Sequence, residues 1–411
     1  MTIQQTISQL TNQCVLCGLC IPHCPTYQIF RTENESPRGR ITLYKALAEA
    51  RFEVSDESRE GLLTSLDHCL SCRACEKMCP SQVQYGLINT LGRALVAEQF
   101  AQKKSLLKSF DKQRLVEKVL VTPALHSLVK FSAKFIAPLE SLTTGSTYSD
   151  EIALQPSKLR DFYPANAPQA QVVLFKGCSS DLFGQQTLLD AIVLLNACQF
   201  DVIVPTKQHC CGGISARQGD QQAMAQLTEQ NRQQFKPLLK TSQALISITN
   251  SCTAQLKDYA DVDFTHQVND IITFLAPAIK SSGLQFAPLP IGSGSQQVGV
   301  HVSCSLKNVL KGDDLLFDLL AQIPNIELIK IDDQFCCGAA GSYMIQYPDV
   351  ANRLLDDKIT AVIAQSYELI VSSNIACSLH FKQGLKTHEE KIGRHVEVIH
   401  PIQLLARQLI T

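Results

Sequence analysis

Residues Cys14–Pro25 read Cys-Val-Leu-Cys-Gly-Leu-Cys-Ile-Pro-His-Cys-Pro, and the same C-x2-C-x2-C-x3-C-P spacing returns 55 residues later at Cys69–Pro80. Three closely spaced thiolates can wrap one [4Fe–4S] cluster, while the fourth cysteine, before proline, reaches the other cluster. The pattern therefore predicts two [4Fe–4S] clusters. The expected ligands are Cys14, Cys17, Cys20 and Cys79 for one cluster, and Cys69, Cys72, Cys75 and Cys24 for the other.

Structural zinc is the alternative for these cysteines. Zinc sites favour paired C-x2-C motifs that supply two ligands each, whereas each run here supplies a triplet and a fourth cysteine. The segment between Cys24 and Cys69 is also longer than a compact two-cluster ferredoxin needs. Ser36 followed by Pro37 is a helix-start signal inside that segment. We therefore expect an α-helical ferredoxin-type head.

Four basic residues lie near the cysteine runs. Charges close to a cluster tune its reduction potential, and ordinary surface or capping roles are the alternative. The candidates are Arg38, Arg40, His68 and Arg73.

A second duplication fills the rest of the chain. Each copy has one cysteine, then a vicinal Cys-Cys-Gly, then one more cysteine, and the first gap is 31 residues in both copies. A repeat of this size indicates two homologous domains rather than a solenoid. The cysteines are Cys178, Cys210, Cys211 and Cys252 in the first copy, and Cys304, Cys336, Cys337 and Cys377 in the second.

Each copy alternates short apolar runs with helical periodicity, as in Val172–Phe175 followed by Thr187–Cys198. Strands alternating with helices predict a mainly parallel sheet. Cysteines that follow such strands are expected to converge at the carboxyl edge of the sheet, where these folds bind ligands. The predicted fold class is α/β, with two homologous Cys-Cys-Gly domains behind the helical head.

The four thiols of each copy can hold a further [4Fe–4S] cluster or a zinc ion, and buried unligated thiols are the alternative. The glycine after each vicinal pair permits a positive φ. The β-like runs Val262–His266 and Val396–His400 each end in a histidine, which either contributes to a site or caps a strand end. His209 has no histidine counterpart in the second copy. Cys198 is expected to pack in the core.

Length and composition set further limits. A chain of 411 residues suggests more than one domain. The 37 basic and 38 acidic residues nearly balance, which argues against a nucleic-acid binder. No apolar run is long enough to cross a bilayer, and the N-terminus has no signal-peptide pattern, so the cytoplasm is the expected location. Thiols stay reduced there, so many cysteines indicate metal or redox chemistry.

The predicted organisation has five parts. Residues 101–134 carry eight Lys or Arg among apolar residues, which suggests a helix that meets a membrane surface or a partner, or else a solvated helix packed on the head. The expected limits are 1–100 for the two-cluster domain, 101–170 for the basic helical segment and linker, 171–280 for the first Cys-Cys-Gly domain, 281–297 for a linker and 298–411 for the second Cys-Cys-Gly domain.

The whole pattern resembles the iron–sulfur subunit of bacterial glycolate oxidase. The segments that carry the resemblance are Pro37-Arg38-Gly39-Arg40, Cys336-Cys337-Gly338-Ala-Ala-Gly341-Ser-Tyr343 and Asn374-Ile-Ala-Cys377. The resemblance implies an electron-transfer subunit that passes electrons from a flavin-binding dehydrogenase subunit to a quinone or another acceptor, on the cytoplasmic face of the inner membrane. This chain shows no flavin or nicotinamide motif, so the substrate chemistry belongs to the partner.

Three alternatives stay open. Similar subunits serve D-lactate, 2-hydroxyglutarate and glycerol-3-phosphate systems. Heterodisulfide reductases share the Cys-Cys-Gly domain, which predicts thiol/disulfide chemistry. Against this, the fullest form of that domain ends in C-x2-C, and here Cys252 and Cys377 stand alone; Val302 also stands where close relatives often have a cysteine. A non-redox protein with zinc in every site is the third alternative.

Overall fold

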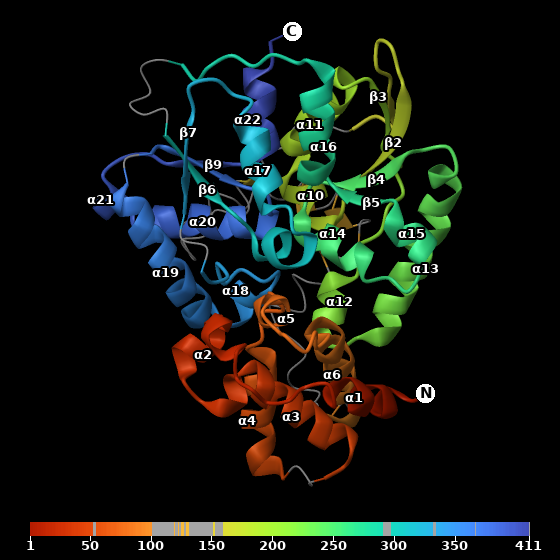
Figure 1. Ribbon diagram of the computed structural model, residues 1–411, viewed down its shortest axis with the longest axis vertical. Helices are drawn as coiled ribbons and strands as arrows, with labels where there is room; N and C mark the ends of the chain where they lie inside the picture. The colour runs from red at the N-terminus through yellow and green to blue at the C-terminus, as the bar shows by residue number, and fades with distance from the viewer. Residues whose placement is uncertain are drawn as a thin grey trace.

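The computed structural model describes residues 1–51, 55–100, 119, 122, 125–126, 129–130, 151–152, 159–290, 297–331, 334–365 and 367–410. A helical head lies at one end of the molecule, and two α/β domains lie beside each other at the other end (Figure 1). The predicted fold class is therefore confirmed. Residues 101–118 of the expected basic segment lie outside the described residues.

The head is built from helices joined by the two cysteine runs. Ser36 caps α3 by accepting a hydrogen bond of 2.9 Å from the Gly39 N–H, and Pro37 occupies the first helical position, as the sequence predicts. Ile7, Tyr44, Ile88 and Leu95 are fully buried at its centre. The helices are α1 (Ile3–Thr11), α2 (Pro25–Phe30), α3 (Pro37–Ala48), α4 (Asp56–Asp67), α5 (Ala74–Lys77) and α6 (Tyr85–Phe100).

The first α/β domain has a sheet in the order β1-β3-β2-β4-β5, in which β1 alone is antiparallel to its neighbour. The strands are β1 (Phe162–Tyr163), β2 (Ala170–Phe175), β3 (Phe200–Ile203), β4 (Ala244–Ser247) and β5 (Val268–Asp270). The helices are α10 (Cys178–Phe183), α11 (Gln185–Ala197), α12 (Gly213–Gln218), α13 (Gln221–Leu239), α14 (Asn250–Lys257), α15 (Val262–His266) and α16 (Ile271–Ser282).

The second α/β domain has a parallel sheet in the equivalent order β7-β6-β8-β9. The strands are β6 (Gln297–His301), β7 (Glu327–Lys330), β8 (Leu369–Ser372) and β9 (Glu397–Ile399). The helices are α17 (Asp313–Leu320), α18 (Tyr343–Gln346), α19 (Pro348–Ala364), α20 (Ile375–Thr387), α21 (Glu389–Ile392) and α22 (Pro401–Gln408), with one π-helical turn at Leu306–Leu310.

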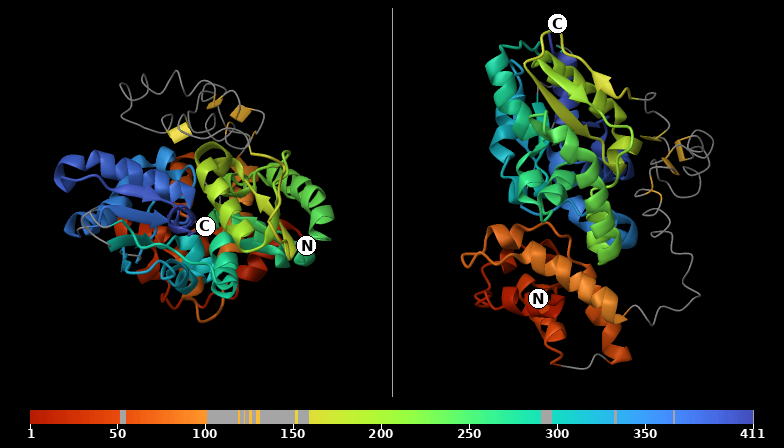
Figure 2. Two further views of the ribbon diagram at one scale, coloured as in Figure 1. Left: turned by 90° about the horizontal axis from the view of Figure 1, so that it is seen from above. Right: turned by 90° about the vertical axis from the view of Figure 1, so that its right-hand side faces the viewer.

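The two α/β domains share one apolar core. Helix α11 packs on α22, and α17, the equivalent of α11, packs on α16, the equivalent of α22. Because this contact is reciprocal, an approximate two-fold axis relates the two domains. The left view of Figure 2 shows the two domains side by side from above. Buried Leu188 and Leu195 of the first domain belong to the same cluster as Ile402 and Leu405 of the second.

The structure corrects two expectations. Val262–His266 is the short helix α15 rather than a β-like run, because the Asp261 side chain accepts a hydrogen bond from the Phe264 N–H and starts a helix. Residues expected to be linker also contribute strand β1, which pairs with β3.

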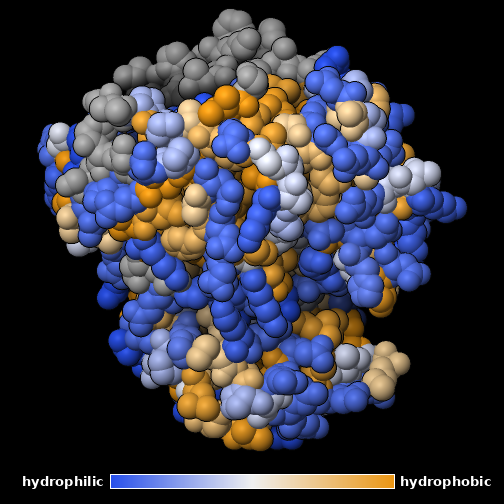
Figure 3. Space-filling model, turned by 45° about the horizontal axis from the view of Figure 1, so that its top comes forward, coloured by the Kyte–Doolittle hydropathy of each residue, from blue (hydrophilic) through white to orange (hydrophobic). Residues whose placement is uncertain are grey.

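One face of the molecule carries side chains of mixed character. Figure 3 shows a face on which hydrophilic and hydrophobic side chains are interspersed. Within the part of the chain that the structure describes, no helix combines the length and apolar character needed to cross a membrane.

Candidate functional site

The first four-cysteine set of the head borders the surface. Cys14, Cys17, Cys20 and Cys79 line one small cavity of about 30 Å³, together with Cys75. Cys17 is exposed, whereas Cys20 is partly buried and burial raises the pKa of its thiol to about 11. This site therefore has one face open to solvent.

The second four-cysteine set lies deeper. Cys24, Cys69, Cys72 and Cys75 line a neighbouring cavity of about 20 Å³. Burial raises the pKa of Cys72 and of Cys75 well above the usual value. Burial also opposes ionisation of Cys69, but the charges of Arg40 and Arg93 outweigh it and lower the pKa of that thiol.

These donor sets fit two [4Fe–4S] clusters. Each cavity is lined by at least four thiols drawn from both cysteine runs, which is enough to supply one thiolate for each iron of a cubane cluster. Cys75 borders both cavities, so the two sites are neighbours. The fourth cysteine of each run, Cys24 or Cys79, thus lines the cavity of the other run.

Three guanidinium groups surround the second set; those of Arg40 and Arg93 are buried, and that of Arg217 is partly buried. Arg40 Nη1 lies 3.8 Å from the Cys24 sulfur. Arg93 Nη2 and Arg217 Nη1 both donate to the carbonyl oxygen of Cys69, at 3.1 and 2.8 Å. Arg217 belongs to α12 of the first α/β domain, so the charge around this site is supplied partly by the tail. Burial lowers the pKa of Arg217 to about 10, which still leaves it charged at neutral pH.

A buried carboxylate balances part of this charge. Glu35 accepts a hydrogen bond of 2.5 Å from Arg40 and lies 2.6 Å from His68 Nδ1. The His68 ring also stacks on Phe30 at 4.4 Å. Arg40 and His68, both proposed from the sequence to tune a cluster, are thus part of one buried polar network beside the second set.

The other two basic candidates lie further out. Arg38 pairs with Glu33 at 2.7 Å and donates to the Leu16 carbonyl oxygen beside the first set. Arg73 pairs with Glu76 at 2.7 Å and with Asp258 of the first α/β domain at 3.1 Å. Arg73 therefore joins the head to the tail.

The tail thiols form one row in each domain, at the carboxyl edge of the sheet. Cys178 lies at the N-terminus of α10 after β2, and Cys252 lies in α14 after β4. The Cys178 and Cys210 sulfurs are 3.5 Å apart. In the second domain the Cys304 and Cys336 sulfurs are 3.9 Å apart. The predicted convergence of the cysteines is therefore observed in both domains.

The glycine after each vicinal pair has the conformation expected of it. Gly212 has φ +83° and Gly338 has φ +85°, a region that favours glycine. A Cβ atom on Gly338 would also lie 2.5 Å from the Ala351 carbonyl oxygen. Both features let the thiols of the pair turn into the row.

One thiol in each row is set apart from the others. Hydrogen bonds from Cys178 and Cys211 lower the pKa of Cys210 well below its usual value, and bonds from Cys304 and Cys337 do the same for Cys336. Hydrogen bonding to that thiolate raises the pKa of Cys178 and of Cys304. Each row therefore stabilises one thiolate, the form that binds a metal.

A cavity of about 550 Å³ lies between the head and both α/β domains. Ser71, Asn89 and Thr90 of the head line one side. Seven thiols from the two tail rows also line this cavity: Cys178, Cys210, Cys211, Cys252, Cys304, Cys336 and Cys377. Asn308 of the second domain donates to the Cys72 carbonyl oxygen at 2.9 Å, which brings the second head set to this boundary.

Other expected residues lie outside the rows. His266 is exposed at the end of α15. His400 is buried and caps α22, and its counterpart in the first domain is Asp270, which caps α16. The equivalence of His266 and His400 was therefore wrong. His209 does not line the thiol cavity, and Cys198 is buried in the shared core, as expected.

Sequence reasoning missed several residues that contact the sites. Arg93 and Arg217 lie far from Cys69 in the chain, and Tyr85 directs its hydroxyl to the Cys69 sulfur at 3.5 Å. His301 lies beside Cys337 and Cys377. Only the position of His301 three residues before Cys304 offers a local signal.

Comparison with known proteins matches two family models. Residues 10–83 match the 4Fe-4S dicluster domain, and residues 172–257 and 298–382 match the cysteine-rich domain. The head therefore holds two [4Fe–4S] clusters. Curated relatives match over most of the chain. A probable glycolate oxidase iron-sulfur subunit of Bacillus subtilis is 27% identical over 98% of this chain and 98% of its own.

Two further relatives also match over most of this chain. A glycolate oxidase iron-sulfur subunit of Escherichia coli is 26% identical over 92% of this chain and 91% of its own. A fumarate reductase (CoM/CoB) subunit of Methanothermobacter marburgensis is 24% identical over 95% of this chain and 71% of its own.

Proposed function

Because this chain belongs to the proteins that join a 4Fe-4S dicluster domain to two cysteine-rich domains, we propose that it is the electron-transfer subunit of a flavin-linked 2-hydroxyacid dehydrogenase, with glycolate as the favoured substrate. Two full-length relatives named as glycolate oxidase iron-sulfur subunits support this choice. Neither a flavin nor a nicotinamide motif occurs in the sequence, so a separate flavoprotein performs the oxidation.

The observation that carries this proposal is the pair of adjacent four-cysteine sites, one open to solvent and one buried against the tail. Bound there, [4Fe–4S] clusters accept and release single electrons. We assign Cys14, Cys17, Cys20 and Cys79 to the outer site, and Cys24, Cys69, Cys72 and Cys75 to the inner one. The protein contributes the ligands, their burial and the charge around each site.

The outer site has the surface expected of a docking face. Val15, Leu16 and Leu19 are 69%, 53% and 57% exposed, and Met78 is 44% exposed. Val15, Leu16 and Leu19 line the same cavity as the exposed Cys17, and Met78 directly precedes Cys79 of the same set. Large exposed apolar residues grouped at one place mark interaction sites. We assign this face to the flavoprotein partner, because it brings a redox partner closest to a cluster ligand.

The charge around the two sites favours electron transfer inward. Arg40 and Arg93 are buried around the inner set and Arg217 is partly buried there, whereas Arg38 beside the outer set is 32% exposed and paired with Glu33. Nearby positive charge stabilises the reduced, more negative state of a cluster and raises its potential. The inner site is therefore expected to have the higher potential, with the electron leaving near the tail towards a quinone or another acceptor.

The proposal is tested by isolating the chain anaerobically alone and with its candidate flavoprotein. Alone, it should contain iron and be reduced by dithionite, yet show no oxidation of glycolate. Together with the flavoprotein, glycolate should reduce both clusters. Glycolate oxidation by the single chain would contradict the assignment, as would a flavoprotein that turns over with glycolate but never reduces this chain.

The large thiol-lined cavity supports a second candidate function, the reduction of a small disulfide. That reaction consumes two electrons and two protons for each disulfide and yields two thiols. The cavity of about 550 Å³ has room for such a substrate beside the inner head site. A new paramagnetic signal when the oxidised protein meets a thiol would favour this function, and its absence would leave electron transfer as the whole role.

A further inference from the structure

The two cysteine-rich domains differ at one position that faces the thiol row. His301 ends strand β6 and pairs across the sheet with Ser372. Phe175 ends the equivalent strand β2 and pairs with Ser247. The second domain therefore has an imidazole where the first has an apolar ring.

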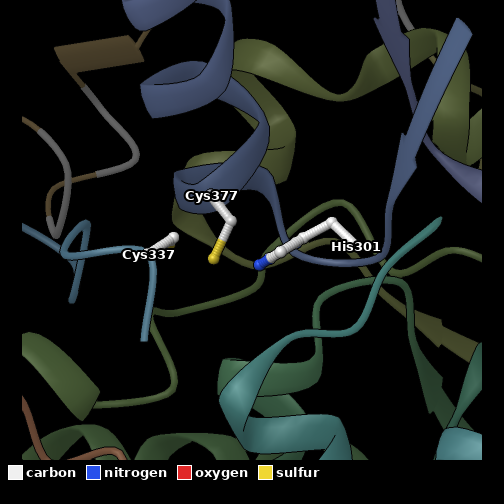
Figure 4. Close-up of side chains that lie close together, drawn as sticks. All are labelled: His301, Cys337 and Cys377. Atoms are coloured by element: carbon white, nitrogen blue, oxygen red, sulfur yellow. The ribbon is translucent and has the colours of Figure 1, made fainter. Parts of the chain in front are cut away.

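The imidazole lies against two thiols. A ring nitrogen of His301 and the sulfurs of Cys337 and Cys377 all lie within 4.8 Å of one another, and all three residues are buried. Figure 4 shows a ring nitrogen of His301 and the sulfur of Cys377 pointing toward each other. Nδ1 of His301 is also 2.8 Å from the Ser372 hydroxyl, which fixes the orientation of the ring. Metal-binding histidines commonly have such a partner on one nitrogen.

The spacing of these donors suits a single ion better than a cubane cluster. Around one tetrahedral zinc, with bonds of about 2.3 Å to sulfur, neighbouring sulfurs lie about 3.8 Å apart. The donor atoms of His301, Cys337 and Cys377 all lie within 4.8 Å of one another, which approaches this spacing. A cubane cluster binds each thiolate to a different iron, which holds the sulfurs farther apart. A mixed nitrogen and sulfur set is also a common zinc environment.

We propose that the second cysteine-rich domain binds one Zn²⁺ through His301, Cys337 and Cys377, with Cys336 as the nearest further thiol of the row. The buried side chain of Lys358 contributes positive charge near Cys336, which offsets part of the charge of several thiolates. At the position of His301 the first domain has the apolar ring of Phe175, so the two homologous domains differ at this point of the thiol row. This inference does not depend on the electron-transfer role.

Three full-length variants test the proposal, each purified anaerobically from cells supplied with zinc and iron. His301→Phe copies the residue of the first domain, His301→Cys replaces the nitrogen ligand with sulfur, and His395→Phe removes an exposed histidine as the control. Zinc and iron per chain are measured together with zinc-edge X-ray absorption. The iron of the head clusters, which should be equal in all variants, reports correct folding.

The wild type and the control should hold about one zinc per chain in a mixed nitrogen and sulfur shell. His301→Phe should weaken zinc binding by at least about tenfold, since even indirect partners of a ligand have effects of that size. His301→Cys should keep the zinc in an all-sulfur shell, which a merely structural histidine would not produce. A wild type without zinc, an all-sulfur wild-type shell, or full zinc binding by His301→Phe would overturn the proposal.

Discussion

Arg217 of the first cysteine-rich domain donates a hydrogen bond of 2.8 Å to the carbonyl oxygen of Cys69 in the head. The same side chain donates to the Asp67 carbonyl oxygen at 3.0 Å and lies over the Tyr343 ring of the second domain at 5.0 Å. One guanidinium therefore contacts all three parts of the molecule beside the inner cluster site. The charge at that site depends on the domains being assembled.

Replacing Arg217 with methionine should lower the reduction potential of the inner site. Methionine keeps much of the apolar stem but removes the charge, and nearby charge tunes cluster potentials. The stability cost should be about 1–3 kcal/mol, because buried carbonyl oxygens lose a donor. Redox titration followed by electron paramagnetic resonance measures the potential. Arg38→Met, at the outer site, is the control and should leave the inner signal in place. An unchanged inner potential in Arg217→Met would contradict the assignment.

Each cluster site is assigned three cysteines of one run and the fourth cysteine of the other run. Cysteine substitutions distinguish this assignment from one in which all four ligands of a cluster come from a single run. Cys79→Ala should remove the same cluster signal as Cys17→Ala, and Cys24→Ala the same signal as Cys72→Ala. The reason is that the fourth cysteine of each run lines the cavity of the other run. Iron content should fall by about half in each variant. If Cys24→Ala instead lost the signal that Cys17→Ala loses, the cross-pairing would be wrong.

Glu35 is expected to be important for stability. Its carboxylate is buried between Arg40 and His68, so Glu35→Gln leaves a buried guanidinium without its counter-charge. Breaking one side of a buried ion pair costs about 3–5 kcal/mol. Glu33→Gln breaks the exposed pair with Arg38 and should cost much less, because solvent screens that pair. Thermal loss of the cluster absorbance compares the two variants, and equal midpoints would argue against a structural role for the buried network.

His400 should make the fold less stable in acid. Burial lowers the pKa of His400 to about 4 from 6.5, while its Nε2 lies 3.0 Å from the Ile248 carbonyl oxygen in the other domain. The unfolded chain binds a proton below about pH 6.5, but the folded chain does not until about pH 4. The contribution of neutral His400 to the free energy of unfolding is therefore complete above about pH 6.5 and is lost as the pH falls toward about 4.

His400→Gln keeps an amide donor for Ile248 and removes the titration, so it should reduce this acid loss by up to about 3 kcal/mol. Asp270 affects the pH dependence of stability in the opposite direction. Burial raises its pKa to about 6 from 3.8, so its contribution to the free energy of unfolding is lost as the pH rises through that interval. Asp270→Asn should therefore steepen the fall toward acid. Thermal unfolding followed by circular dichroism between about pH 4.5 and 7.5 measures both slopes. Parallel curves for the wild type and His400→Gln would exclude this account.

The apolar face around Cys17 should control recognition of the flavoprotein. Leu19→Glu places a charge on that face and should raise the KM for the partner by about tenfold or more, because charged residues are depleted from interface cores. The cluster potentials should stay unchanged. Val262→Glu, at another exposed apolar residue far along the chain, is the matched control. Equal KM values for Leu19→Glu and the control would place the docking face elsewhere.

The sequence by itself determined the chemistry of the head and the repeat of the tail. Cluster ligands are set by cysteine spacing, which is a local property, and Ser36-Pro37 and the short apolar runs specify elements through local backbone preferences. The local pattern gave the wrong prediction at Val262–His266. Alternating side chains suit a strand, but the Asp261 cap starts a helix at these residues, and the strand β5 follows it. Only the tertiary structure decided that Arg93 and Arg217 join Arg40 at the inner site, which residue matches His400, and that His301 faces the thiol row. Each of these depends on side chains from distant segments meeting across a domain boundary or a sheet, and no local spacing encodes such a meeting.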